Sequence, residues 1–310
     1  MKSFAIIGTG GIGGFFGGLL QRGGLEVHFL LHSDYEFVKK NGLTIESAHG
    51  DFNLPQVNAY NDPKKMPACD VTLIALKTTQ NSLLPGILPH TVKDNGIAIS
   101  LQNGLGNEEA VASIVGAERT AGGSCFIGST KMAPGLIRHT DAGQITLGEY
   151  RTDGAPAGIT PRLQRLGGVM KNAGVNVVLA EDLPLVRWKK LCWNIPFNGT
   201  SVVKNALTDE LAGNPELRAL CLKLMEEVAA GSAAVARPVA PEFLDQMMAY
   251  TESMTAYAPS MRVDYDHGRP MEIESIYGAP VRMAGAAGVA MPETEKLYNE
   301  LITLEKEQLK

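Results

Sequence analysis

The sequence contains only four cysteines among its 310 residues, at positions 69, 125, 192 and 221, and no two of them form a C-x-x-C pair. Disulfide frameworks and zinc sites depend on clustered or closely spaced cysteines. Because these four are far apart, we expect free thiols, a reducing compartment and no bound metal.

The sequence also lacks a run of basic residues, and its 33 acidic residues outnumber its 28 lysines and arginines. Nucleic acids and anionic membranes are bound by clustered positive charge, so we expect neither as a partner. The uncharged stretch from Ser3 to Leu20 has too many glycines for a spanning helix, and no A-x-A cleavage site follows it. We therefore expect a cytoplasmic protein.

In the first half of the chain, short apolar runs alternate with helical patterns, which is typical of a parallel α/β sheet. The predicted strands are residues 3–7, 26–31, 43–47, 52–57, 71–76, 97–101 and 175–179, and the predicted helices are 12–21, 35–40 and 161–172. Two weaker strands, 136–139 and 144–148, are expected at the antiparallel edge of the sheet.

After residue 181 no strand pattern occurs and long helical patterns dominate. Asn214-Pro215 is typical of a helix start, and the residues that follow carry an apolar stripe at helical spacing. Further helices are predicted at 242–257, 271–286 and 292–309. We therefore predict a doubly wound, Rossmann-like α/β domain over residues 1–181, followed by an all-α domain over residues 182–310.

A glycine-rich turn joins the first predicted strand to the first helix. It fits the pattern G-x-G-x-x-G with Gly8, Thr9, Gly10, Gly11, Ile12 and Gly13. The first glycine permits the tight turn, the second allows a pyrophosphate to approach the backbone, and the third allows close helix–strand packing. The helix N-terminus adds free N–H groups and a partial positive charge, so we predict a bound dinucleotide.

The end of the second strand indicates which dinucleotide binds. An acidic residue there favours NAD(H), whereas a cation favours NADP(H). The chain has His32 and Ser33 there, which favour NADP(H), and then Asp34, which favours NAD(H) unless it only caps the next helix. We predict NADP(H) and keep NAD(H) as the alternative.

Polar residues also follow two later strands, at the sheet edge where doubly wound folds bind ligands. Lys77 follows the strand at 71–76, and Asn103 follows the strand at 97–101. We predict that both contact the ligand; the alternatives are a solvated lysine and an ordinary Asn-Gly turn.

A polar stripe interrupts an apolar helix near residue 190. Lys190, Asn194 and Asn198 recur at four-residue spacing among tryptophan, leucine and phenylalanine, although Pro196 is expected to kink or end the helix. Buried polar groups need polar partners, and a ligand cleft supplies them. The alternative is a lysine that reaches solvent beside an ordinary buried hydrogen-bond network.

These segments together resemble the ketopantoate reductase family (2-dehydropantoate 2-reductases). The resemblance covers essentially the whole chain in order: the glycine turn, L-K-x-x-Q, Q-N-G-L-G, W-K-K-L-x-x-N-x-x-x-N, S-M-x-x-D and E-I-x-x-x-x-G. It implies that Lys190 and Glu272 are catalytic and that Asn194, Asn198 and Ser260 bind the substrate. Asn103 is implied where nicotinamide and substrate meet, and Glu272 is also expected near the cofactor.

The resemblance further implies NADPH, a role in pantothenate biosynthesis and a homodimer, which is frequent in the family. In the expected reaction, hydride reaches the C2 ketone of a 2-keto acid while the Lys190 ammonium supplies the proton. Two residues depart from the family's pattern: His32 replaces an arginine, and Gly199 replaces a proline. The alternatives are a reductase for another branched 2-keto acid and a non-catalytic NADP(H)-binding regulator.

Overall fold

The computed structural model describes residues 1–309, which form two compact units. The first unit comprises residues 1–102 and 107–183, and the second comprises residues 103–106 and the chain from Pro184 onward. The segment Asn103–Gly106 thus packs with the helical unit, although it lies between two elements of the first unit.

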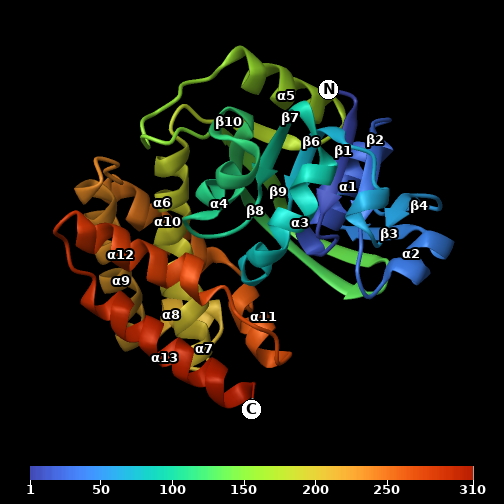
Figure 1. Ribbon diagram of the computed structural model, residues 1–310. Coiled ribbons are helices and arrows are strands. Elements are labelled where there is room, and N and C mark those ends of the chain that lie inside the picture. Colours follow the sequence, from blue (N-terminus) through green and yellow to red (C-terminus); the bar gives the residue numbers. More distant parts are fainter. Residues whose placement is uncertain (310) are drawn as a thin grey trace. The chain divides into compact units, whose positions relative to one another are not determined.

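The first unit contains a ten-stranded sheet with the order β4-β3-β9-β8-β7-β6-β1-β2-β5, and β10 pairs with β9 (Figure 1). Within this order, the neighbouring strands β8, β7, β6, β1, β2 and β5 pair in parallel, as the apolar runs predicted. The strands are β1 (Ser3–Ile7), β2 (Glu26–Leu30), β3 (Leu43–Ser47), β4 (Phe52–Leu54), β5 (Asn58–Tyr60), β6 (Cys69–Ile74), β7 (Val92–Ser100), β8 (Thr120–Ala133), β9 (Leu136–Glu149) and β10 (Asn176–Leu179).

Helices cover both faces of this sheet. They are α1 (Gly11–Arg22), α2 (Tyr35–Asn41), α3 (Leu84–Thr91), α4 (Asn107–Val115) and α5 (Pro161–Asn172). Along β1, Phe4 and Ile6 join the core formed with α1 and α5, whereas Ala5 and Ile7 join a cluster that includes Ile87 of α3. Successive side chains of a strand point to opposite faces, so both faces are buried, and the predicted doubly wound domain is confirmed.

The strands β8 and β9 form a long antiparallel ribbon that the sequence patterns did not predict. Strand β8 is rich in glycine and serine, which are poor strand formers, so its sequence gave no strand signal. The two weak strands predicted at 136–139 and 144–148 are parts of the single strand β9. A bulge near Ala142, whose φ is 57°, interrupts its apolar pattern. The predicted edge position was wrong, because β9 lies between β3 and β8.

The regular elements of the second unit, over its described residues, are all helices. Its elements are α6 (Leu183–Asn194), η4 (Ile195–Gly199), α7 (Thr200–Val203), α8 (Thr208–Gly213), α9 (Pro215–Ala234), α10 (Pro241–Ser253), α11 (Ser260–Asp266), η5 (Glu274–Gly278), α12 (Ala279–Ala286) and α13 (Pro292–Gln308). They enclose a second core around Trp188, Phe197, Leu224 and Tyr277. The predicted helix at 271–286 is in fact η5 followed by α12, preceded by non-helical residues.

Two of these elements, η4 and η5, are π-helical turns, which are rare and often occur at functional sites. Pro196 was expected to kink or end the helix. Instead, α6 passes into η4, which contains Pro196, and η4 passes into α7. Proline lacks a backbone N–H, and the wider turn accommodates the break in the hydrogen-bond ladder while the chain stays helical.

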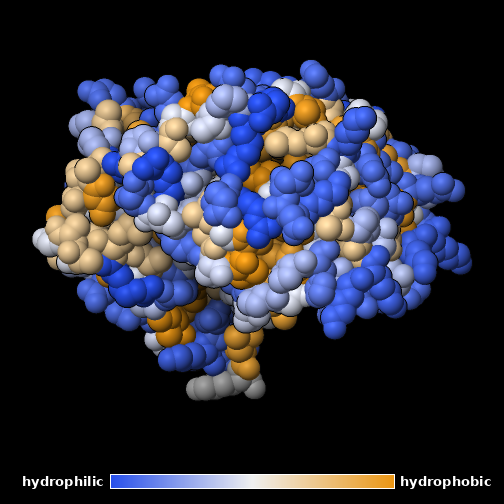
Figure 2. Space-filling model, turned by 45° about the horizontal axis from the view of Figure 1, so that its top comes forward, coloured by the Kyte–Doolittle hydropathy of each residue, from blue (hydrophilic) through white to orange (hydrophobic). Residues whose placement is uncertain are grey.

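Figure 2 shows one face of the protein, where hydrophilic residues predominate and hydrophobic residues form smaller groups between them. Within residues 1–309, no helix has both the length and the apolar character that crossing a membrane requires.

Candidate active site

The glycine-rich turn of the first unit has the geometry that a dinucleotide requires. Gly8 has a φ of 95°, and a Cβ there would lie 2.7 Å from the backbone nitrogen of Leu76. A Cβ on Gly13 would collide with the carbonyl oxygen of Gly8, whereas a Cβ on Gly10 would meet nothing within 4 Å. Two glycines therefore shape the turn, and the third leaves open backbone for a pyrophosphate at the start of α1.

Two contacts fix this turn to its neighbours. The Thr9 hydroxyl donates to the carbonyl oxygen of Leu30 at 3.1 Å, which ties the turn to the end of β2. On the other side, the Ser129 hydroxyl of β8 donates to the carbonyl oxygen of Gly11 at 2.9 Å, and only glycine allows β8 to pass so close to Gly11. Ile12, the remaining residue of the motif, packs against the core of the sheet.

The end of β2 carries the residues predicted to select the cofactor. His32 and Ser33 are exposed, while Asp34 is only 5% exposed. The side chain of Asp34 makes no capping hydrogen bond to α2; instead it forms an ion pair with Lys131 of β8 at 3.1 Å. Lys131 lies on the unpredicted strand, so the sequence gave no sign of this pair. Lys77 is half-buried where the chain leaves β6.

In the second unit, α6 and η4 carry the predicted polar stripe. Lys190 is half-buried, whereas Asn194 is 2% exposed and Asn198 is 1% exposed. The Asn194 Nδ2 atom is buried and has no hydrogen-bond partner within the described residues. Leaving a buried amide donor unpaired costs about 1–3 kcal/mol, so this donor is available to a ligand or to a buried water. Arg187, one turn before Lys190, is a second buried cation that our site prediction did not include.

The second π-helical turn holds the first in place. The fully buried Tyr277 of η5 donates its hydroxyl to the carbonyl oxygens of Ile195 at 3.0 Å and of Asn194 at 3.4 Å. A π turn leaves carbonyl groups outside the regular helical ladder, and this hydroxyl satisfies them. The backbone that carries Asn194 and Asn198 is therefore fixed by a residue more than 80 positions away.

Asn198 contacts the start of α11, where Ser260 lies. The backbone N–H of Met261 donates to Asn198 Oδ1 at 3.5 Å, and Ser260 beside it is exposed. Arg262 of α11 donates to the carbonyl oxygen of Ser201 at 3.0 Å and to Asn205 Oδ1 at 2.6 Å. The structure thus brings Asn198 and the backbone next to Ser260 together.

Asn103 and Glu272 also lie together in the second unit. Asn103 Nδ2 donates to Glu272 Oε2 at 3.3 Å, and Glu272 is only 4% exposed. The N–H of Leu105 donates to the carbonyl oxygen of Ser275 at 2.9 Å, and Gly104 lies against the same serine. The Q-N-G-L-G segment is therefore anchored on the turn that follows Glu272.

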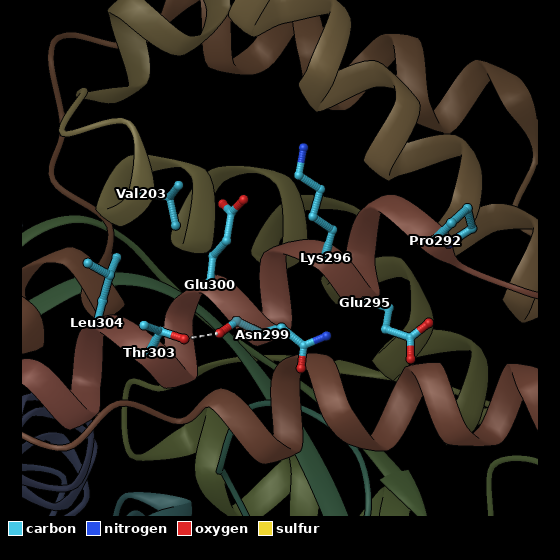
Figure 3. A pocket seen from close by; sticks show the side chains of 8 residues that line it. All are labelled: Val203, Pro292, Glu295, Lys296, Asn299, Glu300, Thr303 and Leu304. Carbon is cyan, nitrogen blue, oxygen red and sulfur yellow. Dashed lines mark hydrogen bonds between the residues drawn. The ribbon is translucent and has the colours of Figure 1, made fainter.

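Two other features, a buried cysteine and a surface pocket, lie outside the candidate site. Burial raises the pKa of the Cys192 thiol to about 12, so this neighbour of the stripe is not a nucleophile at neutral pH. A pocket of about 710 Å³ lies along α13 (Figure 3). It contains none of the predicted site residues, and mostly exposed side chains line it: Val203, Pro292, Glu295, Lys296, Asn299, Glu300, Thr303 and Leu304. We place the candidate site at the buried polar residues instead.

Comparison with known proteins matches both units. The family model described as ketopantoate reductase PanE/ApbA matches residues 4–152, and the corresponding C-terminal model matches residues 182–305. A curated 2-dehydropantoate 2-reductase from Nostoc sp. is 51% identical over 97% of this chain and 94% of its own length.

Solved structures give the same result. A 2-dehydropantoate 2-reductase from Geobacter metallireducens superposes with a TM-score of 0.92 at 39% identity, over 98% of this chain and 99% of that one. A D-mandelate dehydrogenase solved with NADH and anilino(oxo)acetate shares the fold with a TM-score of 0.88 at 20% identity, over 99% of both chains. These matches cover both the glycine turn and the polar stripe, and they show that the chain belongs to the ketopantoate reductase family of oxidoreductases.

Proposed function

We propose that this protein reduces 2-dehydropantoate to pantoate with NADPH, as a step of pantothenate biosynthesis. The observation that carries the proposal is the buried Nδ2 atom of Asn194, which has no hydrogen-bond partner among residues 1–309 and lies one turn from Lys190. A helix that buries such a group among apolar residues is suited to bind a small polar substrate. The Nostoc relative at 51% identity supports the choice of substrate.

The substrate is held by residues of the second unit. Asn194, Asn198 and Ser260 bind its carboxylate and hydroxyl groups and so fix the orientation of the C2 ketone. The contact between Asn198 and the start of α11 supports a shared role for Asn198 and Ser260. Glu272, which accepts a hydrogen bond from Asn103, positions the lysine or a substrate hydroxyl.

Lys190 stabilises the negative charge that develops on the ketone oxygen and donates the proton to it. An ammonium group does this best where water is excluded, because a low dielectric strengthens the attraction. The half-buried position of Lys190, next to the buried Asn194, supports this role. When bound, the nicotinamide cofactor supplies the hydride. The glycine turn from Gly8 to Gly13 would hold its pyrophosphate, and Lys77 and Asn103 are the further residues that would contact the cofactor.

The preference for NADPH is part of the proposal. The exposed imidazole of His32 and the hydroxyl of Ser33 are suited to a 2′-phosphate at the end of β2. The D-mandelate dehydrogenase with the same fold was solved with NADH, so the fold itself does not select between the two cofactors. A homodimer is also proposed, in line with the dimeric ketopantoate reductase of Staphylococcus aureus.

The variant Lys190→Ala tests the catalytic assignment. We expect kcat for 2-dehydropantoate to fall by about 100-fold or more, as for loss of a general acid, while the Kd for NADPH stays unchanged. The matched control is Lys189→Ala, because the neighbouring Lys189 ammonium lies over the ring of Phe243, 5.2 Å from its centroid. Turnover by Lys190→Ala equal to that of Lys189→Ala would rule out Lys190 as the acid.

A second candidate substrate is another branched 2-keto acid, because Gly199 stands where the family often has proline. In this chain a Cβ on Gly199 would lie 2.5 Å from the Tyr277 hydroxyl, so a larger residue does not fit. Because Gly199 adjoins Asn198 in the chain, we expect this departure from the family to affect which keto acid binds. Comparing kcat/KM for 2-dehydropantoate and 2-ketoisovalerate separates the two substrates.

A further inference from the structure

The ion pair between Asp34 and Lys131 joins the end of β2 to the β8–β9 ribbon. Asp34 is 5% exposed, and its carboxylate is 3.1 Å from the Lys131 ammonium, which is 33% exposed. An acidic residue at this place in a Rossmann-like fold usually accepts a hydrogen bond from the ribose 2′-OH of NAD(H). Here the carboxylate is already engaged by a cation of the same unit.

The ribbon is fixed at the phosphate-binding turn, and this fixes the position of Lys131. Ser129 donates to the carbonyl oxygen of Gly11, and the backbone of Ser129 leaves no space for a side chain on Gly11. Lys131 follows Ser129 by two residues, so both side chains project from the same face of β8. In Figure 1 the ribbon, in green, extends along α1 toward α2, which begins directly after Asp34.

We propose that Lys131, held by Asp34, is the cation that recognises the 2′-phosphate of NADP(H). This inference rests on the proposed cofactor. It assigns recognition of the 2′-phosphate to a residue of β8 rather than to the end of β2. A lysine ammonium has three donors, so the one bond to Asp34 leaves others for phosphate oxygens. Asp34 acts as a positioning residue, because its carboxylate accepts one hydrogen bond from the ammonium and so fixes the direction of the remaining donors.

The same arrangement explains how the site does without an arginine at the end of β2. His32 is exposed there and places an imidazole, a hydrogen-bond donor, where an arginine would place a guanidinium. Lys131 supplies a permanent positive charge from a neighbouring strand. The two residues together give the phosphate a hydrogen-bond donor and a cation.

The variant Lys131→Met tests the proposal by binding rather than by turnover. Isothermal titration calorimetry gives the Kd of NADP⁺, NAD⁺, 2′-AMP and 5′-AMP for the intact protein. We expect the variant to bind NADP⁺ and 2′-AMP about tenfold or more weakly, as for loss of a charge-assisted bond, with NAD⁺ and 5′-AMP within about twofold of the wild type. Lys131→Arg should retain most of the NADP⁺ affinity.

The control for ribbon stability is Arg138→Met. Arg138 lies on β9 of the same ribbon and pairs with Glu46 at 2.7 Å, away from Asp34 in the sequence and on the opposite strand. We expect the affinities of this variant for both dinucleotides to stay unchanged, and its Tm to fall by less than that of Lys131→Met, because the Arg138–Glu46 pair is exposed.

Any of three results would overturn the inference. The first is an equal loss of NADP⁺ and NAD⁺ affinity in Lys131→Met, which would make the pair a purely structural link. The second is unchanged NADP⁺ affinity in that variant, and the third is a wild type that prefers NAD⁺. A wild type that binds NADP⁺ tightly but reduces no 2-keto acid would contradict the proposed function and leave this inference supported by its own binding data.

Discussion

Replacing Tyr277 with phenylalanine removes the hydroxyl group that links the two π-helical turns. The hydroxyl lies 3.0 Å from the carbonyl oxygen of Ile195 and 3.4 Å from that of Asn194, and the side chain is fully buried. Burial raises the pKa of Tyr277 far above its usual value, so the hydroxyl keeps its proton and remains a donor. The ring itself stays in place in the variant, and only this polar contact is lost.

The size of the effect follows from the lost contact. A buried hydrogen bond contributes about 1 kcal/mol net, and a buried carbonyl left unpaired costs about 1–3 kcal/mol. We therefore expect the free energy of unfolding to fall by about 1–3 kcal/mol. Because η4 carries Asn198 and adjoins Asn194, we also expect KM for the keto acid to rise several-fold, with a smaller change in the Kd for NADPH.

Urea denaturation and steady-state kinetics measure these two effects. The matched control is Tyr298→Phe, which removes a hydroxyl that donates to Glu274 Oε2 at 2.9 Å on an exposed part of the same unit. That variant should change the unfolding free energy by less than about 0.5 kcal/mol, as exposed substitutions usually do. Equal destabilisation by the two variants, or an unchanged KM in Tyr277→Phe, would refute the role given to the buried hydroxyl.

Two further predictions concern the anchoring of Asn103 and the pH range of stability. Gly104→Ala should destabilise the protein by roughly 2 kcal/mol or more and raise KM, because φ is 84° there and a Cβ would collide with Ser275; Gly106→Ala, with a φ of 87° and open space, should cost about 1 kcal/mol in the same denaturation assay. Burial, together with the charge of His49, lowers the pKa of His139 below 6.5, so the native state binds fewer protons than the unfolded chain. The contribution of His139 to stability is therefore complete above pH 6.5 and is lost as the pH falls below that value. When the pH is lowered from about 7.5 to 5.5, the Tm of the wild type should fall more than the Tm of His139→Gln. Equal falls in the two proteins would contradict this prediction.

Much of the fold could be predicted because its signals are local. The glycine turn, the apolar runs of β1 and β6 and the proline-initiated helices α5, α9 and α13 all lie where the sequence placed them. Each of these features depends on residues within one element, such as an apolar run or a proline in the first helical turn.

The missed features depend on residues far apart in the sequence. Strand β8 forms because β7 and β9 supply hydrogen-bond partners, although its glycines and serines favour no strand. The pair of Asp34 with Lys131 joins residues 97 positions apart, and the contact of Asn103 with Glu272 joins residues 169 positions apart. A single sequence contains no signal for either pair. The resemblance to ketopantoate reductases placed Asn103 and Glu272 in one site, and their individual roles stay predictions.

The two π-helical turns also affect how this chain is to be aligned with its relatives. A π turn is equivalent to one inserted residue in an otherwise regular helix. Removing that residue would rotate everything after it by about 100° around the helix axis, the angle of one step in an α-helix. In α6 and η4 such a deletion would turn Asn198 away from α11. Lys190, Asn194 and Asn198 would all still be present in the sequence. A sequence alignment with relatives must therefore place any gap in α6 and η4 correctly. Only relatives without a gap there can be assigned the same substrate site, whatever their overall identity.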